Sequence, residues 1–253
     1  MSLNFPNFVT VSVVVALLVA GCSSPQDSSV GQTVPTLSTD QVAIEKVDIP
    51  LTKDIKIDGE FKDWRKVRPV YVGTKDHLYI GPEHWVDPDD LCYTARLATD
   101  GELLYVLVNV QDDQTKIDAD EPWRNDAVEF FWDFRPDAER DGKHGEATGQ
   151  VILVVPETDK PAEVSFYNVR QEFPDRLKSA FRRHEKGYLC EFSLPLADMG
   201  MKGKAQAGTS FHFDLQVDDR DVVEGIECLS MMSLVGKPES FKSTEYYIRG
   251  TVK

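Results

Sequence analysis

The stretch Pro122–Phe134 reads Pro-Trp-Arg-Asn-Asp-Ala-Val-Glu-Phe-Phe-Trp-Asp-Phe and is rich in aromatic and β-branched residues. This composition predicts a strand from Asp126 onward. Side chains alternate between the two faces of a strand, so Val128 and every second residue from it form an apolar side that is predicted to face the core. The other side carries Glu129 and Asp133 and is predicted to be exposed or to face a ligand.

Trp123 comes just before this strand, where its ring can fold over the side that carries Glu129. An aromatic ring covers the apolar C–H face of a sugar, while a carboxylate accepts hydrogen bonds from its hydroxyls. Trp123 and Glu129 are therefore a candidate sugar-binding pair, and the alternative is that Trp123 is an ordinary core residue. Trp85 stands in a loop-like stretch and is a second candidate ring, with loop anchoring as its alternative.

The charge of the 253-residue chain is concentrated in two places. The formal net charge is −15; residues 87–141 hold sixteen acids and five bases (a net of −11), and residues 214–227 hold six acids and one base (a net of −5). Phosphate binding needs clusters of Lys and Arg, so a nucleic-acid partner is excluded. The acids instead suggest calcium, which takes several oxygen ligands, or else a solvated acidic face. The candidate ligands are Asp112, Asp113, Asp118, Asp120 and Asp126, or Asp218, Asp219 and Asp221.

The first 22 residues are predicted to be a targeting segment. An apolar run from Val9 to Ala20 is too short to span a membrane, which needs about 20 residues. It ends in Leu18-Val19-Ala20-Gly21-Cys22, which resembles the bacterial lipobox, although no Lys or Arg precedes the run. Cys22 is therefore the predicted lipidation site of a lipoprotein at the bacterial cell envelope, on the outer membrane or cell surface. Residues 23–42 are polar and predict a flexible tether.

Three cysteines remain for the folded part, namely Cys92, Cys190 and Cys228. No Cys-x-x-Cys pair exists, which argues against a structural zinc site. One disulfide with a spare thiol and three buried thiols are both compatible with this number.

Residues 43–253 are predicted to form one all-β domain, a single antiparallel β-sandwich of nine to eleven strands. Alternating or apolar runs recur between turn signals, and no segment has a long helical period. Asp54–Gly59 is expected to be a strand, residues 65–90 to be irregular, and Glu245–Arg249 to be the terminal strand. The segments 91–98 and 102–110 predict a hairpin through Thr99-Asp100-Gly101.

Several of these segments together resemble the family 9 carbohydrate-binding modules, which are related to other jelly-roll-like or immunoglobulin-like sandwiches of the DOMON type. The matching motifs are Ile57-Asp58-Gly59 with Trp64, the strand Leu104–Asp113, the stretch Trp123–Phe131, the stretch Gly187–Leu196 and the strand Phe213–Asp219. They follow one another in the order expected of the family.

The resemblance implies a β-sandwich that binds sugars or polysaccharides, often with structural calcium and often beside a glycoside hydrolase that would be its partner in carbohydrate catabolism. Members of the family hold a terminal sugar between two Trp rings. Trp123 matches the first ring and Glu129 an adjacent carboxylate. The segment 228–233, where the second ring is expected, has no Trp, and Met231 stands there as a weaker apolar contact.

Two alternatives to a non-catalytic, lipid-anchored binding module remain. A glycoside hydrolase needs two carboxylates about 5–10 Å apart, and the many acids of this chain do not single out such a pair. A haem-binding redox module of a related sandwich would need ligands such as Met231 or Met232 with His212. The binding module is the leading hypothesis, and no catalytic residues are assigned.

Overall fold

The computed structural model describes residues 44–158, 162–237 and 240–253, and within these ranges the regular structure consists of β-strands and five short 3-10 turns. The predicted lipidation site Cys22 and the tether lie outside the described residues. Among the described residues, no helix is long and apolar enough to cross a membrane.

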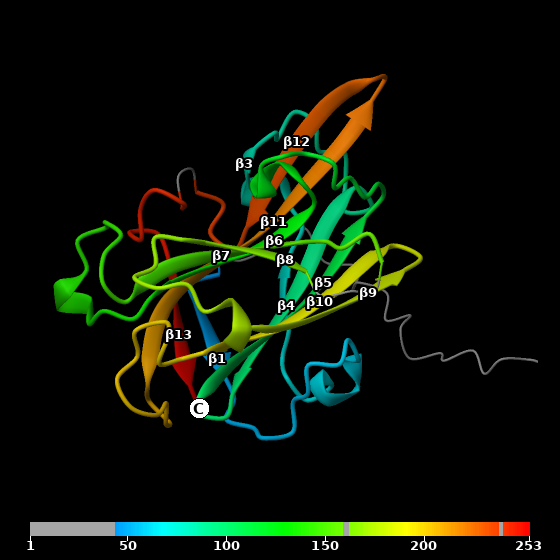
Figure 1. Ribbon diagram of the computed structural model, residues 1–253. Helices are drawn as coiled ribbons and strands as arrows, with labels where there is room; N and C mark the ends of the chain where they lie inside the picture. Colours follow the sequence, from blue (N-terminus) through cyan, green and yellow to red (C-terminus); the bar gives the residue numbers. More distant parts are fainter. Residues whose placement is uncertain (1–43, 159–161, 238–239) are drawn as a thin grey trace, which may run out of the picture.

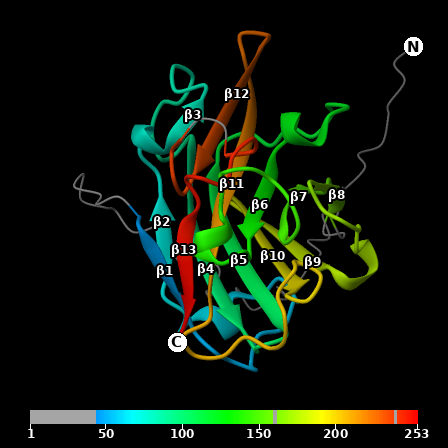
Figure 2. The same cartoon turned by 90° about the vertical axis from the view of Figure 1, so that its left-hand side faces the viewer.

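Within the described ranges, thirteen strands form two sheets that pack face to face (Figures 1 and 2). The eight-stranded sheet runs in the order β1-β13-β11-β6-β7-β8, with β12 paired to β11 and β3 paired to β12. It consists of β1 (Lys46–Ile49), β3 (Leu78–Ile80), β6 (Ala127–Asp133), β7 (Thr148–Val154), β8 (Glu163–Tyr167), β11 (Ser210–Val223), β12 (Ile226–Ser233) and β13 (Ile248–Val252). The five-stranded sheet runs β2-β4-β5-β10-β9 and consists of β2 (Val70–Val72), β4 (Leu91–Thr99), β5 (Leu103–Asp112), β9 (Lys178–His184) and β10 (Gly187–Pro195).

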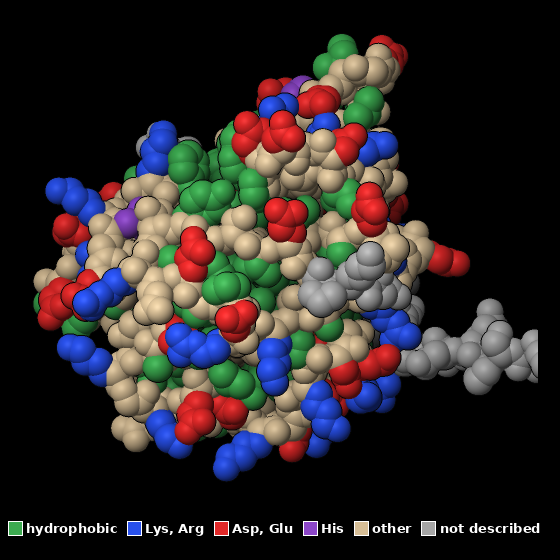
Figure 3. Space-filling model, viewed as in Figure 1, with side chains coloured by type: hydrophobic (Ala, Val, Ile, Leu, Met, Phe, Trp, Pro, Cys, Tyr) green, Lys and Arg blue, Asp and Glu red, His purple; other side chains and the backbone are tan. Residues whose placement is uncertain are grey.

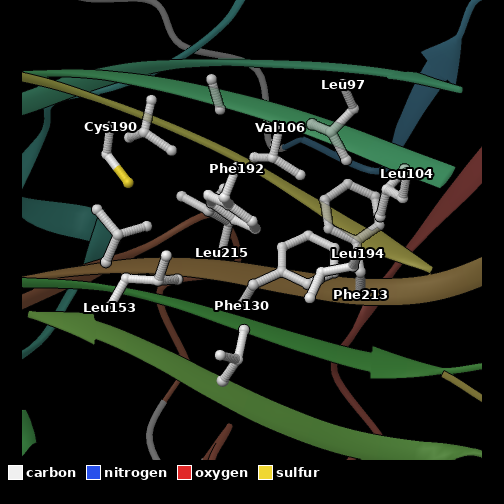
Figure 4. Packing of buried hydrophobic residues seen from close by; sticks show 14 of the residues in the cluster. Leu97, Leu104, Val106, Phe130, Leu153, Cys190, Phe192, Leu194, Phe213 and Leu215 are labelled. Atoms are coloured by element: carbon white, nitrogen blue, oxygen red, sulfur yellow. The ribbon is translucent and has the colours of Figure 1, made fainter. Parts of the chain in front are cut away.

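The core lies between the two sheets, as the strand pattern predicts. Phe130 of β6 stacks on Phe213 of β11, with ring centroids 5.6 Å apart, and meets Phe192 of β10 edge-on at 6.1 Å. Figure 4 shows these rings pointing toward one another from the two sheets, with Leu153 and Val106 beside them. The apolar side of the strand after Trp123 therefore faces the core, as expected.

The sandwich is confirmed, and all strand pairings are antiparallel except that of β1 with β13. The number of strands exceeds the expected nine to eleven. One reason is that β2 and β3 fall within residues 65–90, which were expected to be irregular. These strands are only three residues long and carry too short a pattern to stand out.

Two other expectations were wrong in detail. The segment 54–59 forms no strand, because the backbone N–H groups of Asp58 and Gly59 donate to the side chain of Glu191 instead of to a neighbouring strand. The last strand begins at Ile248 instead of Glu245. The segment before it, residues 240–247, folds over the outer face of the eight-stranded sheet, where Tyr247 packs against Phe131.

The outer side of β6 is therefore buried and not exposed. Asp133 is fully buried, and its carboxylate accepts hydrogen bonds from the guanidinium groups of Arg135 and Arg140. The three cysteines of the folded part, Cys92, Cys190 and Cys228, are all free and buried, so the disulfide alternative does not hold.

Candidate functional site

A pocket of about 490 Å³ lies on the outer face of the eight-stranded sheet. Its size falls within the range of about 300–1,000 Å³ that is usual for small-molecule sites. Its walls come from β3, β6, β7, β8, β11 and β12, from the turn η3 (Pro122–Arg124) and from the segment 240–247. Hydrophobic side chains gather in this region, between the C-terminal segment and the loop that carries η3 (Figure 3).

The floor of the pocket is set by strand register. Gln216 of β11 lies directly opposite Glu129 of β6, and Glu129 lies opposite Ile152 of β7. Gln150 comes two residues before Ile152 on β7 and therefore points to the same face. A row of one carboxyl, two amides and one apolar side chain thus forms the floor.

The polar groups of the floor are connected by hydrogen bonds. Gln150 Nε2 donates to Glu129 Oε2 at 2.8 Å, and the Tyr79 hydroxyl donates to Gln216 Oε1 at 2.6 Å. Gln216 Nε2 in turn donates to Asp218 Oδ1, two residues further along β11, at 2.6 Å. Such a network holds each amide in one orientation, so the floor presents a defined pattern of donors and acceptors.

Glu129 is 2% exposed and lines the pocket. Burial raises the pKa of its carboxyl to about 7, and the nearby Asp214 carboxylate also acts to raise it. Burial and the charge of Glu129 raise the pKa of Asp218 well above its usual range. Near neutral pH the Glu129 carboxyl can therefore both donate a hydrogen bond to a ligand oxygen and accept one from a ligand hydroxyl.

Trp123 forms one aromatic wall, and the residue is 41% exposed. Its turn is held by the buried Asn125, whose Nδ2 donates 3.0 Å hydrogen bonds to the carbonyl oxygens of Ala119 and Glu121. The ring is therefore presented on a braced loop. The alternative that Trp123 is an ordinary core residue does not agree with this exposure.

Phe241, which is 39% exposed, supplies a further aromatic wall that was not predicted from the sequence. His144 Nε2 donates to the Phe241 carbonyl oxygen at 2.9 Å, and the Tyr247 hydroxyl donates to the Ser240 carbonyl oxygen at 2.9 Å. The second ring was expected within residues 228–233, which are part of β12. The sequence signal that could have identified Phe241 is an aromatic residue in the loop after β12.

Residues of β3 and β12 line one side of the pocket. Met231 lies opposite Ile80 in the β12–β3 pairing, and its Sδ is 3.3 Å from the Tyr79 hydroxyl. Met231 is only 4% exposed, so it contributes to the wall and offers little surface for stacking.

The structure thus brings together three of the four predicted ligand-binding residues, Trp123, Glu129 and Met231. Trp85 is not among the residues that line the pocket. Its indole Nε1 donates to the Leu91 carbonyl oxygen at 2.9 Å, and its ring packs against the main core. This position matches the loop-anchoring alternative.

The acidic residues gather away from the pocket floor, near the end of β5 and the C-terminal part of β11. Among the described residues, two groups have carboxylate oxygens within 4.8 Å of one another: Asp112, Asp113 and Asp221, and Asp90, Asp219 and Asp221. Asp221 belongs to both groups. We call these five residues the acidic cluster.

The acidic cluster overlaps only partly with the predicted ligands. Asp118 pairs with Arg220 instead, and Asp126 accepts hydrogen bonds from the backbone N–H groups of Lys116 and Arg220. Asp120 and Asp218 belong to neither group. Asp90 was not among the predicted ligands, because it lies in a loop that is far from the other acids in sequence. The pairing of β4 with β5 brings it beside them.

The residues of the acidic cluster fit a hard cation. Asp219 is 3% exposed, and one carboxylate oxygen each of Asp219 and Asp221 is buried with no hydrogen-bond partner among the described residues. Burial raises the pKa of Asp112 to about 7 and that of Asp221 to about 6, and neighbouring carboxylates act in the same direction. All the donors are oxygen atoms, which suits calcium.

The haem alternative finds no support in the geometry. Met231 and Met232 lie opposite Asp218 and Val217 of β11. His212 lies six and five residues before these positions on the same strand, roughly 17–20 Å away. His212 Nε2 instead lies 3.7 Å from the Asp137 carboxylate. The side chain of His212 is therefore too far from either methionine for the two to ligate one iron.

Comparisons with known proteins agree with the motifs. Residues 57–252 match the family described as carbohydrate family 9 binding domain-like. The exoglucanase XynX of Acetivibrio thermocellus is 29% identical over 167 residues, or 65% of this chain, and the matched region spans 13% of that protein's length.

Two solved structures share the fold. Both are family 9 carbohydrate-binding modules from Caldicellulosiruptor kristjanssonii, one in complex with cellotriose and one in complex with glucose. They are each 16% identical to this chain, with TM-scores of 0.65 and 0.64. Each comparison covers 82% of this chain, and 93% and 95% of those chains respectively.

Proposed function

The chain belongs to the carbohydrate family 9 binding domain-like family, and on that premise we propose that it is a non-catalytic module that binds carbohydrate in the pocket over Glu129. The observation that carries this proposal is the combination of exposed aromatic walls, Trp123 and Phe241, with a floor of one carboxyl and two amides. Aromatic faces suit the apolar face of a sugar ring, and the floor groups suit its hydroxyls.

We propose glucose-containing oligosaccharides as the first ligands to examine. The two structures with the same fold hold cellotriose and glucose. The curated relative is an exoglucanase, which supports a role beside a partner glycoside hydrolase in carbohydrate breakdown.

The pocket does not favour hydrolysis by this chain. A glycoside hydrolase places two carboxyl groups about 5–10 Å apart on either side of the scissile bond. Among the described residues that line the pocket, Glu129 is the only one with a carboxyl group. We therefore propose binding without bond cleavage.

The test is calorimetric titration of the protein with soluble oligosaccharides, namely gluco-, xylo-, manno- and galacto-oligomers, together with an assay for reducing-sugar release. The expected result is saturable binding of at least one series without release of new reducing ends. Binding to none of them would overturn the proposal, and release of reducing sugar would replace it with the hydrolase alternative.

We further propose that the acidic cluster holds structural calcium. Five carboxylates close together repel one another unless a cation neutralises them. The cluster lies at the start of the loop from Asp112 to Asp126 that carries Trp123, so a cation there would brace the loop as well as the strands. The alternative is a solvated acidic face.

We also propose that the module is attached to the cell envelope by lipid at Cys22. The support is in the sequence alone, in the short apolar run and the lipobox-like residues before Cys22. The sandwich begins with β1 at Lys46, so residues 23–42 would separate the pocket from the membrane surface.

A further inference from the structure

Asp133 lies on the same side of β6 as Glu129, four residues further along, but it is not among the residues that line the pocket. Its buried carboxylate accepts hydrogen bonds from Arg135 Nε at 3.0 Å and Nη2 at 2.8 Å, and from Arg140 Nε at 3.3 Å. Burial acts to raise the pKa of Asp133, but the hydrogen bonds from Arg135 bring it below its ordinary value, so the group is ionised near neutral pH.

The two guanidinium groups also bind the C-terminal segment 240–247. Arg140 Nη2 donates to the Thr244 carbonyl oxygen, and Arg135 Nη2 donates to the Thr244 hydroxyl at 3.3 Å. The backbone N–H of Thr244 donates to the Gly142 carbonyl oxygen at 2.9 Å. The fully buried Thr244 thus ties the segment to the loop after β6, which carries η4 (Asp137–Glu139) (Figure 1). We call Asp133, Arg135, Arg140 and Thr244 the ion network.

Phe241, the aromatic wall of the pocket, lies three residues before Thr244 in this segment. The loop after β6 contacts Phe241 as well, since His144 Nε2 lies 2.9 Å from the Phe241 carbonyl oxygen. The side chain of Phe241 is well exposed, so core packing holds it only in part. Its position over the pocket therefore depends on how the backbone of the segment is held.

The ion network is suited to holding the segment and not to contacting a ligand. None of its four residues is among those that line the pocket. A buried carboxylate with its guanidinium partners adds little net stability relative to apolar side chains of similar volume. Guanidinium groups instead fix orientation, because their N–H groups bind oxygen atoms in a defined planar geometry.

We propose that the ion network positions Phe241, so that Asp133, Arg135 and Arg140 determine sugar affinity without touching the sugar. This inference rests on the proposed function. Loss of a contact in the network lets the segment 240–247 move relative to the sheet. A bound sugar then loses its stacking on Phe241, while Trp123 and the floor over Glu129 remain in place.

The experiment measures affinity by calorimetric titration of the full chain with the oligosaccharide that the wild type binds most tightly among the gluco-, xylo-, manno- and galacto-oligomers. Arg140→Ala removes two contacts of the network, Arg140→Lys keeps the charge beside Asp133, and Thr244→Val removes only the hydroxyl. The matched control is Arg96→Ala, because Arg96 is a buried arginine of the five-stranded sheet whose Nε donates to the Val67 carbonyl oxygen at 3.1 Å.

Arg140→Ala and Thr244→Val are also combined with Phe241→Ala and, separately, with Trp123→Ala. This comparison distinguishes a positioning role from a general loss of stability. If the network acts through Phe241, Arg140→Ala changes affinity little once Phe241 is alanine, but keeps its full effect when Trp123 is alanine. A general loss of stability would act equally in both backgrounds. Melting temperatures are measured in parallel, and Thr244→Val keeps the test decisive should Arg140→Ala fail to fold.

Arg140→Ala is expected to weaken binding by up to the roughly ten- to hundredfold that removal of one stacked ring causes. Thr244→Val should weaken it by roughly two- to tenfold, the range that one hydrogen bond provides. Arg140→Lys should retain more affinity than Arg140→Ala, and Arg96→Ala should leave affinity unchanged. Without sugar, trypsin should cut after Lys242 faster in Arg140→Ala than in the wild type, because the segment is released.

Two results would overturn the positioning role and leave the proposed function intact. One is wild-type affinity in both Arg140→Ala and Thr244→Val. The other is an equal loss of affinity in the Phe241→Ala and Trp123→Ala backgrounds. Failure of the wild type to bind any oligosaccharide would instead remove the proposed function, and the positioning role with it.

Discussion

Trp64 and Glu191 are 127 residues apart in sequence, and the indole Nε1 of Trp64 donates a 2.6 Å hydrogen bond to Glu191 Oε1. The second oxygen of Glu191 accepts from the backbone N–H groups of Asp58 and Gly59, at 2.9 and 2.7 Å. Both Trp64 and Glu191 are fully buried. One carboxyl group thus fastens the segment 55–67 onto the outer face of the five-stranded sheet, over the smaller hydrophobic cluster around Leu107 and Leu189.

We expect Trp64→Phe and Glu191→Gln each to lower the free energy of unfolding by about 1–3 kcal/mol, because each change leaves a buried polar group without its partner. Urea denaturation measures this. Lys62→Ala is the control, since Lys62 pairs with Asp58 in the same segment but is exposed, and it should change stability little. Sugar affinity should be unaffected in all three variants, because the segment lies on the opposite side of the sandwich from the pocket.

Two tryptophans should respond differently to the same change. Trp123→Ala is expected to weaken sugar binding by about ten- to hundredfold, because a stacked ring is lost, and to leave the melting temperature nearly unchanged. Trp85→Ala is expected to cost on the order of 2 kcal/mol of stability, because the ring packs on the core, and to leave sugar affinity unchanged. Calorimetric titration and thermal melts of both variants provide the comparison, and a damaged melt in Trp123→Ala would assign that ring to the core.

Phe241→Ala should weaken binding by an amount similar to that of Trp123→Ala, because the second aromatic wall is removed. Phe241→Trp should bind at least as tightly as the wild type, since the larger ring offers more stacking surface. Affinity for the best oligosaccharide of the panel is the measurement. If Phe241→Ala binds normally, the segment 240–247 covers the sheet without contacting the ligand.

The acidic cluster should make stability depend on pH and on calcium together. The pKa of Asp112 is about 7 and that of Asp221 about 6 in the folded chain, against an ordinary value of 3.8. Without a cation, the folded state therefore binds more protons than the unfolded state between about pH 4 and 7, and stability falls as the pH rises through that window. In EDTA we expect a higher melting temperature at about pH 5.5 than at about pH 7.5.

Added calcium should raise the melting temperature mainly at the higher pH, where the carboxylates are ionised and the folded state can bind the ion. Asp221→Asn should abolish this response, because Asp221 belongs to both groups of the cluster. Asp120→Asn is the matched control and should respond as the wild type does. Melting curves that EDTA and calcium leave unchanged would identify the cluster as a solvated acidic face.

Cys22→Ala is expected to abolish lipid attachment, since the thiol is the proposed acceptor of the lipid. The variant should appear in the soluble fraction or as an unprocessed precursor when it is expressed in a bacterial host with its leader. Membrane fractionation with detection of the protein is the measurement, and Cys228→Ala serves as the control. Unchanged membrane association of Cys22→Ala would rule out the lipoprotein.

The sequence alone determined those features that depend on neighbours along the chain. Alternation in the stretch Pro122–Phe134 showed which side of β6 faces the core, and Thr99-Asp100-Gly101 marked the turn between β4 and β5. Trp123 and Glu129 could be paired as pocket residues because only six positions separate them. Short pieces such as β2 and β3 carry too few alternations to be recognised in this way.

Only the tertiary structure decided what came together across the sheets. Phe241 reaches the pocket because residues 240–247 fold back over β6 and β11, and Asp90 meets Asp219 and Asp221 because the loop before β4 lies beside β11. Tyr167 and Met231 line one pocket from opposite sides, although 64 positions separate them, because strand order places β8 and β12 on either side of β6, β7 and β11. Alternation is a local property of the backbone, whereas strand order follows from how all thirteen strands bury their apolar sides at once, and no local pattern records that result.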